Sequence, residues 1–485
     1  MPVPPRTPVL IGRSQIIGPP PNIDDPITVD TLMADAARAA LADASIDGAD
    51  VDLVGVVKGL YRHPNMGQAI ARTIGAADAH TVATTWGGNT PIAFVGELGD
   101  RVARGDVDVA LMLGGEANAT RDAVRRAGGE APHPAADSDL DEPETWGPPL
   151  VMADPADRDR GGELPINTYA VFESALRAAE HESLDESRDR AAALWAGYAA
   201  VAAANPDLAP HDPMTAEQIR TPSPSNRMVS WPYTKAMCAN NRVDHAAGLV
   251  VTCHEVAERL GVPAEQRVYF HDLLTASDTD SFLTRASIDE VPALAAATKD
   301  LRDRWNPATE IAHVDLYGCF PSIVRYTAAG LGLDTDRPLT VSGGLGFMGA
   351  PLNYAAGQSL VAMVRTLRED PGSFGLVQGN GGHAAKHAFG VFSTQPPDVE
   401  VRTRSLPAAE PDRLAAPSDA SGPATLDGIT IEYDRTGPQR AVAICRFPDG
   451  GRLWANSTDP EVLDAAIERE LVGASVRVEA GIFSL

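Results

Sequence analysis

One pattern that the chain contains twice restricts its fold more than any other feature. Each copy has an apolar strand that enters a Gly-Gly pair and a proline, then a helix, then a second strand that ends at another Gly-Gly pair. The copies span 81–115 and 339–382. A duplication of this length predicts two similar lobes, and the alternation of strands with helices predicts an α/β sheet in each lobe. A functional site is expected where corresponding strand ends of the two lobes meet.

The remaining sequence divides into segments of different composition. At 485 residues, the chain exceeds the size of a single hydrophobic core. Residues 119–235 are rich in Pro, Asp and Gly, with one clear predicted helix at 184–204, so we interpret them as an inserted loop or lid domain. After a Pro-, Ala- and Ser-rich linker, strands alternate around one helix, which is typical of a small β-rich, OB-like domain. The predicted units are a first lobe (1–118, completed by 236–262), the insertion (119–235), a second lobe (263–395), the linker (396–424) and the C-terminal domain (425–485).

Charge and composition exclude several classes of protein. The chain has 66 Asp and Glu against 40 Lys and Arg, a net charge of −26, which repels nucleic acids and anionic membranes. No apolar run approaches the ~20 residues of a membrane-spanning helix, and the N-terminus has no signal-peptide pattern. The four cysteines are scattered, without metal-ligand spacing. We therefore predict a cytoplasmic protein with no bound metal and no permanent cofactor.

Four segments together resemble the thiolase superfamily. They are Asp-Val-Ala-Leu-Met-Leu-Gly-Gly (108–115), Asp-His-Ala-Ala-Gly (244–248), Tyr-Gly-Cys-Phe (317–320) and Gly-Gly-Leu-Gly-Phe-Met-Gly-Ala-Pro (343–351). The likeness covers residues 8–395 and is greatest to sterol-carrier-protein-type thiolases and to thiolase-like proteins of the acetyl-CoA acetyltransferase type. It implies a duplicated, layered αβαβα fold, a CoA thioester as ligand, and acyltransferase or carbon–carbon bond chemistry in lipid metabolism. It also implies a homodimer, while the additional domain and the negative charge leave a monomer open.

The residues that perform thiolase chemistry are replaced at all four matching positions. The nucleophilic cysteine of the family matches Gly88, and the chain has no cysteine before Cys238. The histidine that activates it matches Ala350, the acid–base cysteine matches Gly379, and the Asn or His that orients a water or an oxyanion matches Tyr317. Glycine cannot supply the thiolate that acyl transfer needs. The resemblance therefore implies a protein that is not an ordinary thiolase.

Three polar residues remain as catalytic candidates. Tyr317 could exchange a proton with a substrate, as tyrosines do in the thiolase-fold aldolases that it resembles, which work with an OB-type partner; alternatively, it packs at a strand end. His383 and His387 are four residues apart. They would share a face if that segment were helical, and either could then act as a base near neutral pH. Alternatively, one caps a strand and the other is a surface residue.

Backbone amides around the glycines are the candidate binding groups. At the start of the helix predicted after Pro91, they could hold an oxyanion or another anion. The segment 344–349 also fits GxGxxG, a weak signal that close backbone approach explains equally well. The residues that we expect to bind the CoA thioester are Gly88, Asn89, Thr90, Gly343, Gly344, Gly381 and Gly382.

Three functional hypotheses remain open. The first is a protein that binds CoA thioesters and makes or cleaves a carbon–carbon bond, with Tyr317 as the proton-transfer residue. The second is a non-catalytic carrier or scaffold that binds acyl-CoA, or meets a protein partner through residues 425–485. The third is a conventional acetyl-CoA acetyltransferase with Cys319 as a displaced nucleophile. A packed cysteine at the start of a helix is the simpler explanation for Cys319.

Overall fold

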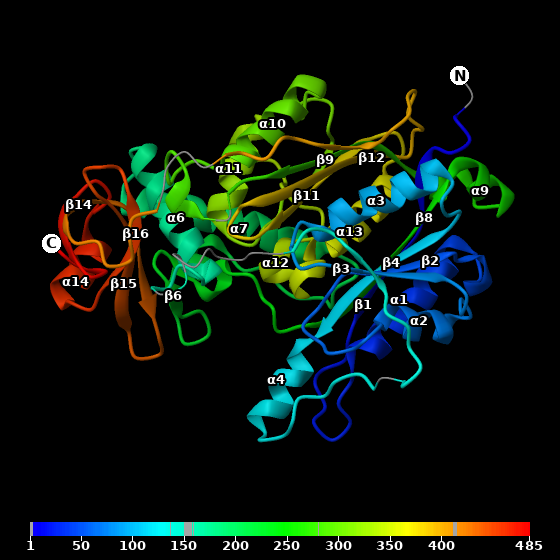
Figure 1. Ribbon diagram of the computed structural model, residues 1–485, viewed down its shortest axis with the longest axis horizontal. Coiled ribbons are helices and arrows are strands. Elements are labelled where there is room, and N and C mark those ends of the chain that lie inside the picture. The colour runs from blue at the N-terminus through cyan, green and yellow to red at the C-terminus, as the bar shows by residue number, and fades with distance from the viewer. Residues whose placement is uncertain (1–2, 136, 150–157, 159, 280, 411–414) are drawn as a thin grey trace.

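The main sheet runs through both predicted lobes (Figure 1). The computed structural model describes residues 3–135, 137–149, 158, 160–279, 281–410 and 415–485. Eleven strands form the sheet in the order β10-β11-β12-β9-β1-β8-β4-β2-β3-β5, with β13 beside β9. They are β1 (Pro8–Ile17), β2 (Leu53–Val56), β3 (His80–Thr84), β4 (Ala110–Ala117), β5 (Glu144–Trp146), β8 (Asp244–Cys253), β9 (Val268–Ser277), β10 (His313–Asp315), β11 (Phe374–Gly381), β12 (Lys386–Ser393) and β13 (Thr403–Ser405).

Local sequence signals explain where several helices begin and end. Ser183 and Glu186 form a reciprocal capping box at the start of α7. Pro91 lies in the first turn of α3, and Gly105 ends that helix with φ +80°. Within the described residues, no helix is long and apolar enough to cross a bilayer. The α-helices are α1 (Val29–Ala44), α2 (Met66–Ile74), α3 (Thr90–Arg104), α4 (Asn118–Arg126), α6 (Pro165–Ala179), α7 (Leu184–Ala204), α8 (Ala216–Arg220), α9 (His254–Arg259), α10 (Pro292–Arg304), α11 (Pro321–Leu331), α12 (Gly344–Phe347), α13 (Ala355–Glu369) and α14 (Pro460–Glu468), with short 3-10 turns at Gly48–Asp50, Lys235–Met237, Ala264–Gln266, Phe282–Thr284 and Leu352–Tyr354.

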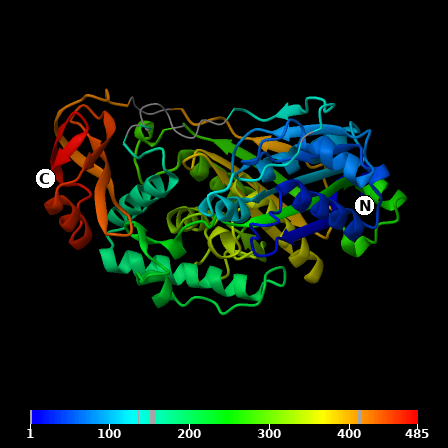
Figure 2. The same cartoon turned by 90° about the horizontal axis from the view of Figure 1, so that it is seen from below.

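The two lobes form a five-layered arrangement. Their parts of the sheet join where Val9 and Leu10 of β1 pair with Tyr269 and Val268 of β9. The buried helices α3 and α13 lie between the two parts and contact strands of both. On the outer faces, α1 packs against β1 and β8, and α10 packs against β9. The duplicated αβαβα fold expected from the sequence is therefore confirmed (Figures 1 and 2).

The prediction of a strand over 339–342 in the second lobe is wrong. These residues follow an irregular path into the turn at Gly343. Asp315, at the end of β10, accepts a hydrogen bond from the Thr340 hydroxyl (2.7 Å) and from the next two backbone amides (2.9 Å each). A carboxylate that takes successive amides in this way replaces strand pairing with a local turn.

The C-terminal strands close into a small barrel in the order β15-β16-β18-β17-β14, with β14 also paired to β15. The expected small β-rich domain is confirmed. Two strands of the insertion extend its sheet, because Ser230 of β6 pairs with Glu432 of β14. The strands are β14 (Gly422–Tyr433), β15 (Pro438–Arg446), β16 (Arg452–Ser457), β17 (Ser475–Glu479), β18 (Ile482–Ser484), β6 (Met228–Ser230) and β7 (Tyr233–Thr234).

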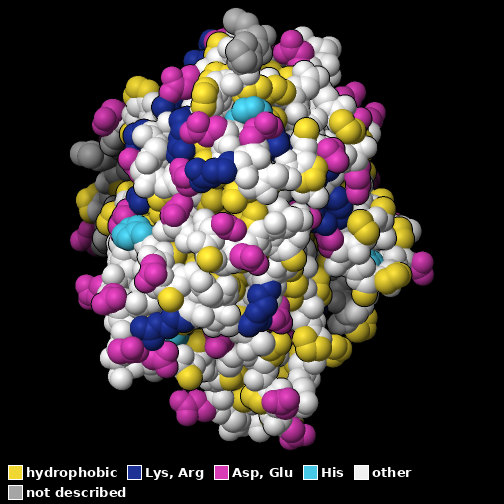
Figure 3. Space-filling model, turned by 90° about the vertical axis from the view of Figure 1, so that its right-hand side faces the viewer, with side chains coloured by type: hydrophobic (Ala, Val, Ile, Leu, Met, Phe, Trp, Pro, Cys, Tyr) yellow, Lys and Arg dark blue, Asp and Glu magenta, His cyan; other side chains and the backbone are white. Residues whose placement is uncertain are grey.

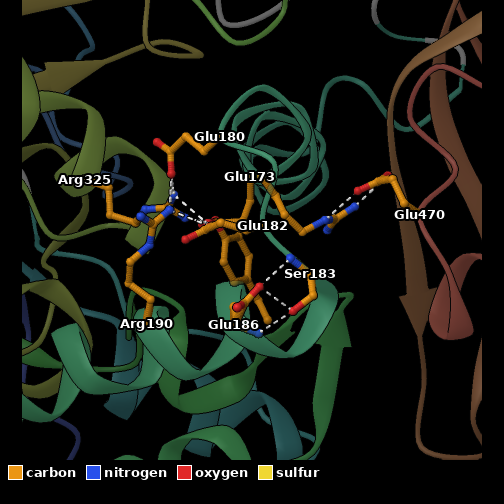
Figure 4. Close-up of polar contacts among 10 residues, drawn as sticks. Glu173, Glu180, Glu182, Ser183, Glu186, Arg190, Arg325 and Glu470 are labelled. Carbon is orange, nitrogen blue, oxygen red and sulfur yellow. Dashed lines mark hydrogen bonds and ion pairs between the residues drawn. The ribbon is translucent and has the colours of Figure 1, made fainter.

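Helix α6 of the insertion connects the barrel to the lobes. On the barrel side, Arg177 forms an ion pair with Glu470 (2.8 Å). On the other side, the buried Glu173 accepts a hydrogen bond from the Tyr233 hydroxyl (2.7 Å) and pairs with Arg325 of α11. Figure 4 shows this ion-pair network and the barrel strand beside it. These contacts fix α6 on both sides. The α6 side chains that face the lobes are therefore held in place.

Candidate functional site

At the centre of the site, two backbone segments lie very close to each other. Glycines on both segments allow this close approach. A side chain at Gly88, just before α3, would collide with the Asn380 carbonyl oxygen and with the Tyr317 hydroxyl. A Cβ atom at Gly379 would lie 2.9 Å from the Cα atom of Asn89, and one at Gly381 would collide with the Asn89 side-chain oxygen. Separations below 3 Å are not tolerated by real Cβ atoms, so glycine is needed here. The structure thus brings together residues of both copies of the sequence repeat.

The Tyr317 hydroxyl lies in the space that a side chain at residue 88 would need. The backbone nitrogen of Tyr317 donates to the Gln378 side-chain oxygen (3.1 Å). Its hydroxyl has no hydrogen-bond partner in the described part of the chain, and the residue is 7% exposed. Burial, and then the nearby Cys319, raise the pKa of Tyr317 above its usual value. The phenol therefore stays neutral at physiological pH and can donate a hydrogen bond to a ligand.

Tyr169 of α6 is a site residue that the sequence did not reveal. Its hydroxyl accepts hydrogen bonds from the Asn380 side chain (2.7 Å) and from the Ala384 amide (3.0 Å). Its ring stacks on Phe320, whose other neighbour is Tyr233, with ring centroids 4.8 and 5.6 Å apart. Burial, and then Cys319, raise the pKa of Tyr169 well above its usual value. Since Tyr169 lies in the insertion, far from both copies of the repeat, no motif pointed to it.

Cys319 lies in this cluster but is poorly suited to be a nucleophile. Its sulfur is 3.8 Å from the Asn380 side-chain nitrogen. Burial raises the pKa of the thiol to about 12, so almost none of it is thiolate at neutral pH. The carbonyl oxygen of the Asn380 side chain is buried and has no partner in the structure's described portion. The geometry therefore favours the packed-cysteine explanation.

The segment that carries the two predicted histidines is not helical, so they do not share a helix face. His383 lies in the turn after β11, and His387 lies on β12. Both are almost fully buried, at 3% and 0% exposure. Burial lowers the pKa of His383 to about 4 and that of His387 to about 3. The His387 Nε2 atom lies 3.1 Å from the Ala384 carbonyl oxygen, so the sequence segment is held as a tight β-turn rather than a helix. Neither imidazole has the pKa near 7 that suits a general base.

The remaining predicted binding residues fall into two groups. Thr90 is buried, and its amide donates to the Gly87 carbonyl (3.0 Å) at the start of α3. Gly382, with φ +63°, makes the turn between β11 and β12. By contrast, Gly343 and Gly344 pack under Ala202 and Tyr198 of α7. Close backbone approach therefore explains the GxGxxG pattern.

Other features of the described residues do not enlarge this site. Among those residues, no group of three His, Cys, Asp or Glu side chains could hold a metal ion. One cavity of about 430 Å³ lies between α6, residues 286–289 and the barrel. Another of about 410 Å³ lies beside His80 and the C-terminal end of α3. Neither cavity is lined by Gly88 or Tyr317.

Comparisons with known proteins agree with the fold. The family described as the thiolase-like protein type 1 additional C-terminal domain matches residues 408–481. The structure of a monomeric SCP2-thiolase like protein type 1 from Mycobacterium smegmatis is 29% identical, covers 100% of both chains and superposes with a TM-score of 0.81. The dimeric peroxisomal thiolase of Saccharomyces cerevisiae is 16% identical over 81% of this chain and 98% of its own, with a TM-score of 0.58. An Ltp2-ChsH2(DUF35) aldolase is 18% identical over 80% and 98%, with a TM-score of 0.57. No curated protein matches the chain.

The duplicated fold and the altered centre define the class: this chain is a thiolase-like protein. It carries an extra C-terminal domain, because residues 408–481 match the additional C-terminal domain of thiolase-like protein type 1.

Proposed function

We propose that this protein binds a CoA thioester at the Gly88 centre and does not perform thiolase acyl transfer. One observation carries the proposal. The space that a nucleophilic side chain at residue 88 would need is filled by the Tyr317 hydroxyl and the Asn380 carbonyl. A thiolate therefore has no room there, and the buried Cys319 is a poor substitute. The thiolase fold of the chain and of its structural neighbours supports a thioester ligand.

The chain's own groups could hold a thioester carbonyl without covalent catalysis. The neutral Tyr317 hydroxyl would donate a hydrogen bond to the carbonyl oxygen, and amides at the start of α3 would add to it. Such donors also stabilise an enolate oxygen, which forms when a carbon–carbon bond next to the thioester is made or broken. A tyrosine-dependent (retro-)aldolase is therefore the second candidate, favoured by the Tyr317 hydroxyl, which lies beside Gly88 and has no hydrogen-bond partner among the described residues.

Calorimetric titration with CoA and a panel of acyl-CoAs tests the first proposal. Wild-type protein should bind acyl-CoAs in the micromolar range and show no thiolysis. Tyr317→Phe should weaken acyl-CoA binding about tenfold, because a hydrogen bond to the carbonyl is lost, and should leave binding of free CoA unchanged. Tyr354→Phe is the matched control, since that hydroxyl is also partnerless within the described structure but is sealed in the interior. Absence of acyl-CoA binding would overturn the proposal.

The aldolase candidate needs its own measurement. Retro-aldol turnover of β-hydroxyacyl-CoAs should fall at least a hundredfold in Tyr317→Phe. Undiminished turnover in that variant would remove Tyr317 from the mechanism, and no turnover in the wild type would leave the protein a carrier.

The role of the C-terminal barrel belongs to the same proposal. Its ring of five strands with a helix after the third strand supports an OB-type barrel. Such domains bind ligands or partners on an open face. If the barrel served only to recruit a protein partner, its deletion would leave acyl-CoA binding intact. Because the barrel holds α6, and α6 carries Tyr169, we expect deletion of 422–485 to weaken acyl-CoA binding as well.

A further inference from the structure

A cavity of about 430 Å³ lies where the barrel meets α6 and residues 286–289. Its volume is at the lower end of the ~300–1,000 Å³ that small-molecule sites have. Figure 1 shows α6 beside the barrel. The residues that line the cavity do not include Gly88 or Tyr317. It is therefore a second place where a small organic ligand could bind, bounded by three parts of the chain that only folding brings together.

The barrel contributes a guanidinium with unused donors to this cavity. Arg446, at the end of β15, donates from its Nε atom to the Asp427 carboxylate (3.0 Å) and makes no hydrogen bond with any other described residue. Its side chain is 40% exposed and has no buried, partnerless nitrogen, so the terminal nitrogens reach open space. A guanidinium in this state can bind both oxygens of a carboxylate.

Asp427 compensates the charge of Arg446 only in part, because a second arginine shares it. The Nε atom of the buried Arg452 also donates to the Asp427 carboxylate (2.6 Å). A terminal nitrogen of Arg452 donates to the Ala286 carbonyl oxygen (3.1 Å), which ties the barrel wall to the loop 286–289. The barrel wall is therefore held in place and offers a positive group to an anion.

The loop 286–289 contributes a carboxylate. One oxygen of Asp289 accepts a hydrogen bond from the Ser287 hydroxyl. Asp289 is only half-buried and forms no ion pair with any described residue. The bond from Ser287 orients the carboxylate and leaves its second oxygen for another donor. An ammonium group suits that oxygen, because it carries three N–H donors and a positive charge.

The helix α6 contributes a small apolar surface. Ala175, Ala178 and Ala179 all line the cavity, and their spacing of three and four residues places them on one face of the helix. Leu426 of β14 and Ile288 of the loop are almost fully buried beside the same cavity. Methyl groups in place of larger side chains leave room along α6 for an aliphatic group, whose burial is favourable.

We propose that this cavity binds an α-amino acid with an aliphatic side chain. The carboxylate of the ligand would pair with Arg446, its ammonium group with Asp289, and its side chain would lie along the α6 alanines. A ligand with only a carboxylate would leave Asp289 uncompensated, and a ligand with only an amine would leave Arg446 in that state. Thioester binding at the Gly88 centre is not needed for this site.

The charge of the whole molecule favours such a ligand over a simple anion. The net charge is −26, and Figure 3 shows acidic side chains spread among basic ones over one face. A surface of this kind repels anions at long range. A zwitterion has no net charge, so this repulsion does not act on it, and it still supplies a carboxylate to Arg446.

Calorimetric titration of the full-length protein with L-alanine, L-valine and L-leucine tests the site. We expect the affinity to rise with side-chain size, and L-leucine to bind with a Kd of about 1 mM or less. Isocaproate lacks the ammonium group of leucine, and isoamylamine lacks its carboxylate. Each should bind about tenfold more weakly or worse, because a charged hydrogen bond is lost. If none of the three amino acids binds, or if either analogue binds as tightly as L-leucine, the inference is wrong.

Two charge-removing variants have matched controls. Arg446→Gln and Asp289→Asn should each weaken L-leucine binding about tenfold or more. Arg477→Gln removes an exposed arginine of the same barrel, which pairs with Glu479 (3.1 Å) and does not line the cavity. Glu290→Gln removes the exposed acid next to Asp289. Both controls should keep an affinity within about twofold of the wild type.

A third variant obstructs the cavity without a change of charge. Ala179 is exposed at the end of α6, so Ala179→Leu should leave the core intact while its larger side chain fills the space for the ligand. L-leucine binding should fall about tenfold or more. Thermal unfolding of each variant identifies any that does not fold. Wild-type affinity for L-leucine in folded Arg446→Gln and Ala179→Leu would overturn the site.

The outcomes separate this site from the thioester site. Tyr317→Phe should bind L-leucine as the wild type does, and Arg446→Gln should bind acyl-CoAs as the wild type does. Wild-type protein that binds L-leucine but no acyl-CoA would support the cavity site and overturn the thioester proposal. Binding of acyl-CoA without binding of any of the three amino acids would have the opposite meaning.

Discussion

The two copies of the repeat pack a tyrosine against a glycine, but they use the tyrosine differently. In the first copy Gly88 faces Tyr317, and in the second Gly344 faces Tyr198 of α7. The Tyr198 hydroxyl lies 3.1 Å from both the Leu316 and the Leu339 carbonyl oxygens and is buried. The Tyr317 hydroxyl has no such partner among described residues. The tyrosine–glycine contact is therefore structural at Gly344, whereas at Gly88 it leaves the tyrosine hydroxyl free to donate a hydrogen bond.

Under the proposed function, this difference favours the Gly88 centre over the Gly343 turn as the place of the ligand. The insertion covers the Gly343 turn with α7, whose Ala202 and Tyr198 fill the space above it. Over the first copy, the insertion contributes Tyr169 through α6, and that side chain bonds to Asn380 rather than to the Tyr317 hydroxyl. Substitutions at the Gly343 turn and at the Gly88 centre should therefore differ in whether they change the free energy of unfolding or the binding of a ligand.

The largest effect is expected from Gly343→Ala. This residue has φ +100°, and a Cβ atom there would lie 2.6 Å from the Cα atom of Ala202 and 2.8 Å from its nitrogen. Backbone strain and overpacking together should lower the free energy of unfolding by about 3 kcal/mol or more. Urea denaturation measures the loss. The control is Gly197→Ala on α7, the helix that carries Ala202. A Cβ atom at Gly197 meets nothing within 4 Å, so this change should stabilise the protein by up to about 1 kcal/mol.

A smaller loss is expected from Gly88→Ala, because this residue is not in the left-handed region and one of the two groups that a Cβ atom meets is a side-chain hydroxyl. The fixed Asn380 carbonyl still opposes it, so we expect a cost of about 1–3 kcal/mol. Tyr317→Ala should recover part of this cost, with a coupling of about 0.5–2 kcal/mol in a double-mutant cycle. Additive effects would show that Tyr317 does not fill the nucleophile position.

Much of this architecture could be predicted from the sequence, because glycine pairs and strand–helix alternation are local signals. They predicted two lobes, and the resemblance to thiolases implied that Gly88 and Tyr317 belong to one centre. The course of 339–342 was not predictable, since it depends on Asp315 capturing amides from a separate segment. The sequence also did not predict helix α6, because nearly all of its faces are buried and the amphipathic periodicity that marks a surface helix is missing. For the same reason, Tyr169 was not recognised as a site residue.

The histidines show a different limit of sequence reasoning. Their spacing of four fits a helix, but Gly381 and Gly382 begin a turn, and Ala384 takes φ +52° within it. The β11–β12 hairpin then pairs His387 with Asn380. Burial on the sheet, which lowers the pKa of both imidazoles, is a tertiary effect that spacing cannot reveal.

A moderate effect is expected from Tyr198→Phe. The change removes a buried hydroxyl that donates to the Leu316 or the Leu339 carbonyl and leaves ring packing on Gly344 intact. Loss of the bond should cost about 1–2 kcal/mol without changing the urea m-value. Acyl-CoA affinity, measured by calorimetry, should stay within twofold of the wild type. A tenfold loss of affinity would mean that the two tyrosines are not divided into structural and ligand-binding roles.

The smallest effects on the free energy of unfolding are expected where a tyrosine hydroxyl has no partner. Two such tyrosines allow a direct comparison of stability with acyl-CoA binding. Tyr354 packs its ring on Gly114 and Gly357, and its hydroxyl is buried without a partner in the described structure. Tyr354→Phe should be neutral or stabilise the protein by up to about 1 kcal/mol, because an unsatisfied polar group leaves the interior. Tyr317→Phe should change stability by less than about 0.5 kcal/mol. The two variants would then be alike in urea denaturation and different in acyl-CoA titration, where only Tyr317→Phe loses affinity. Equal affinities would place the thioester carbonyl away from Tyr317, whereas a large stability loss in Tyr317→Phe would mean that its hydroxyl is bonded within the protein, as that of Tyr198 is.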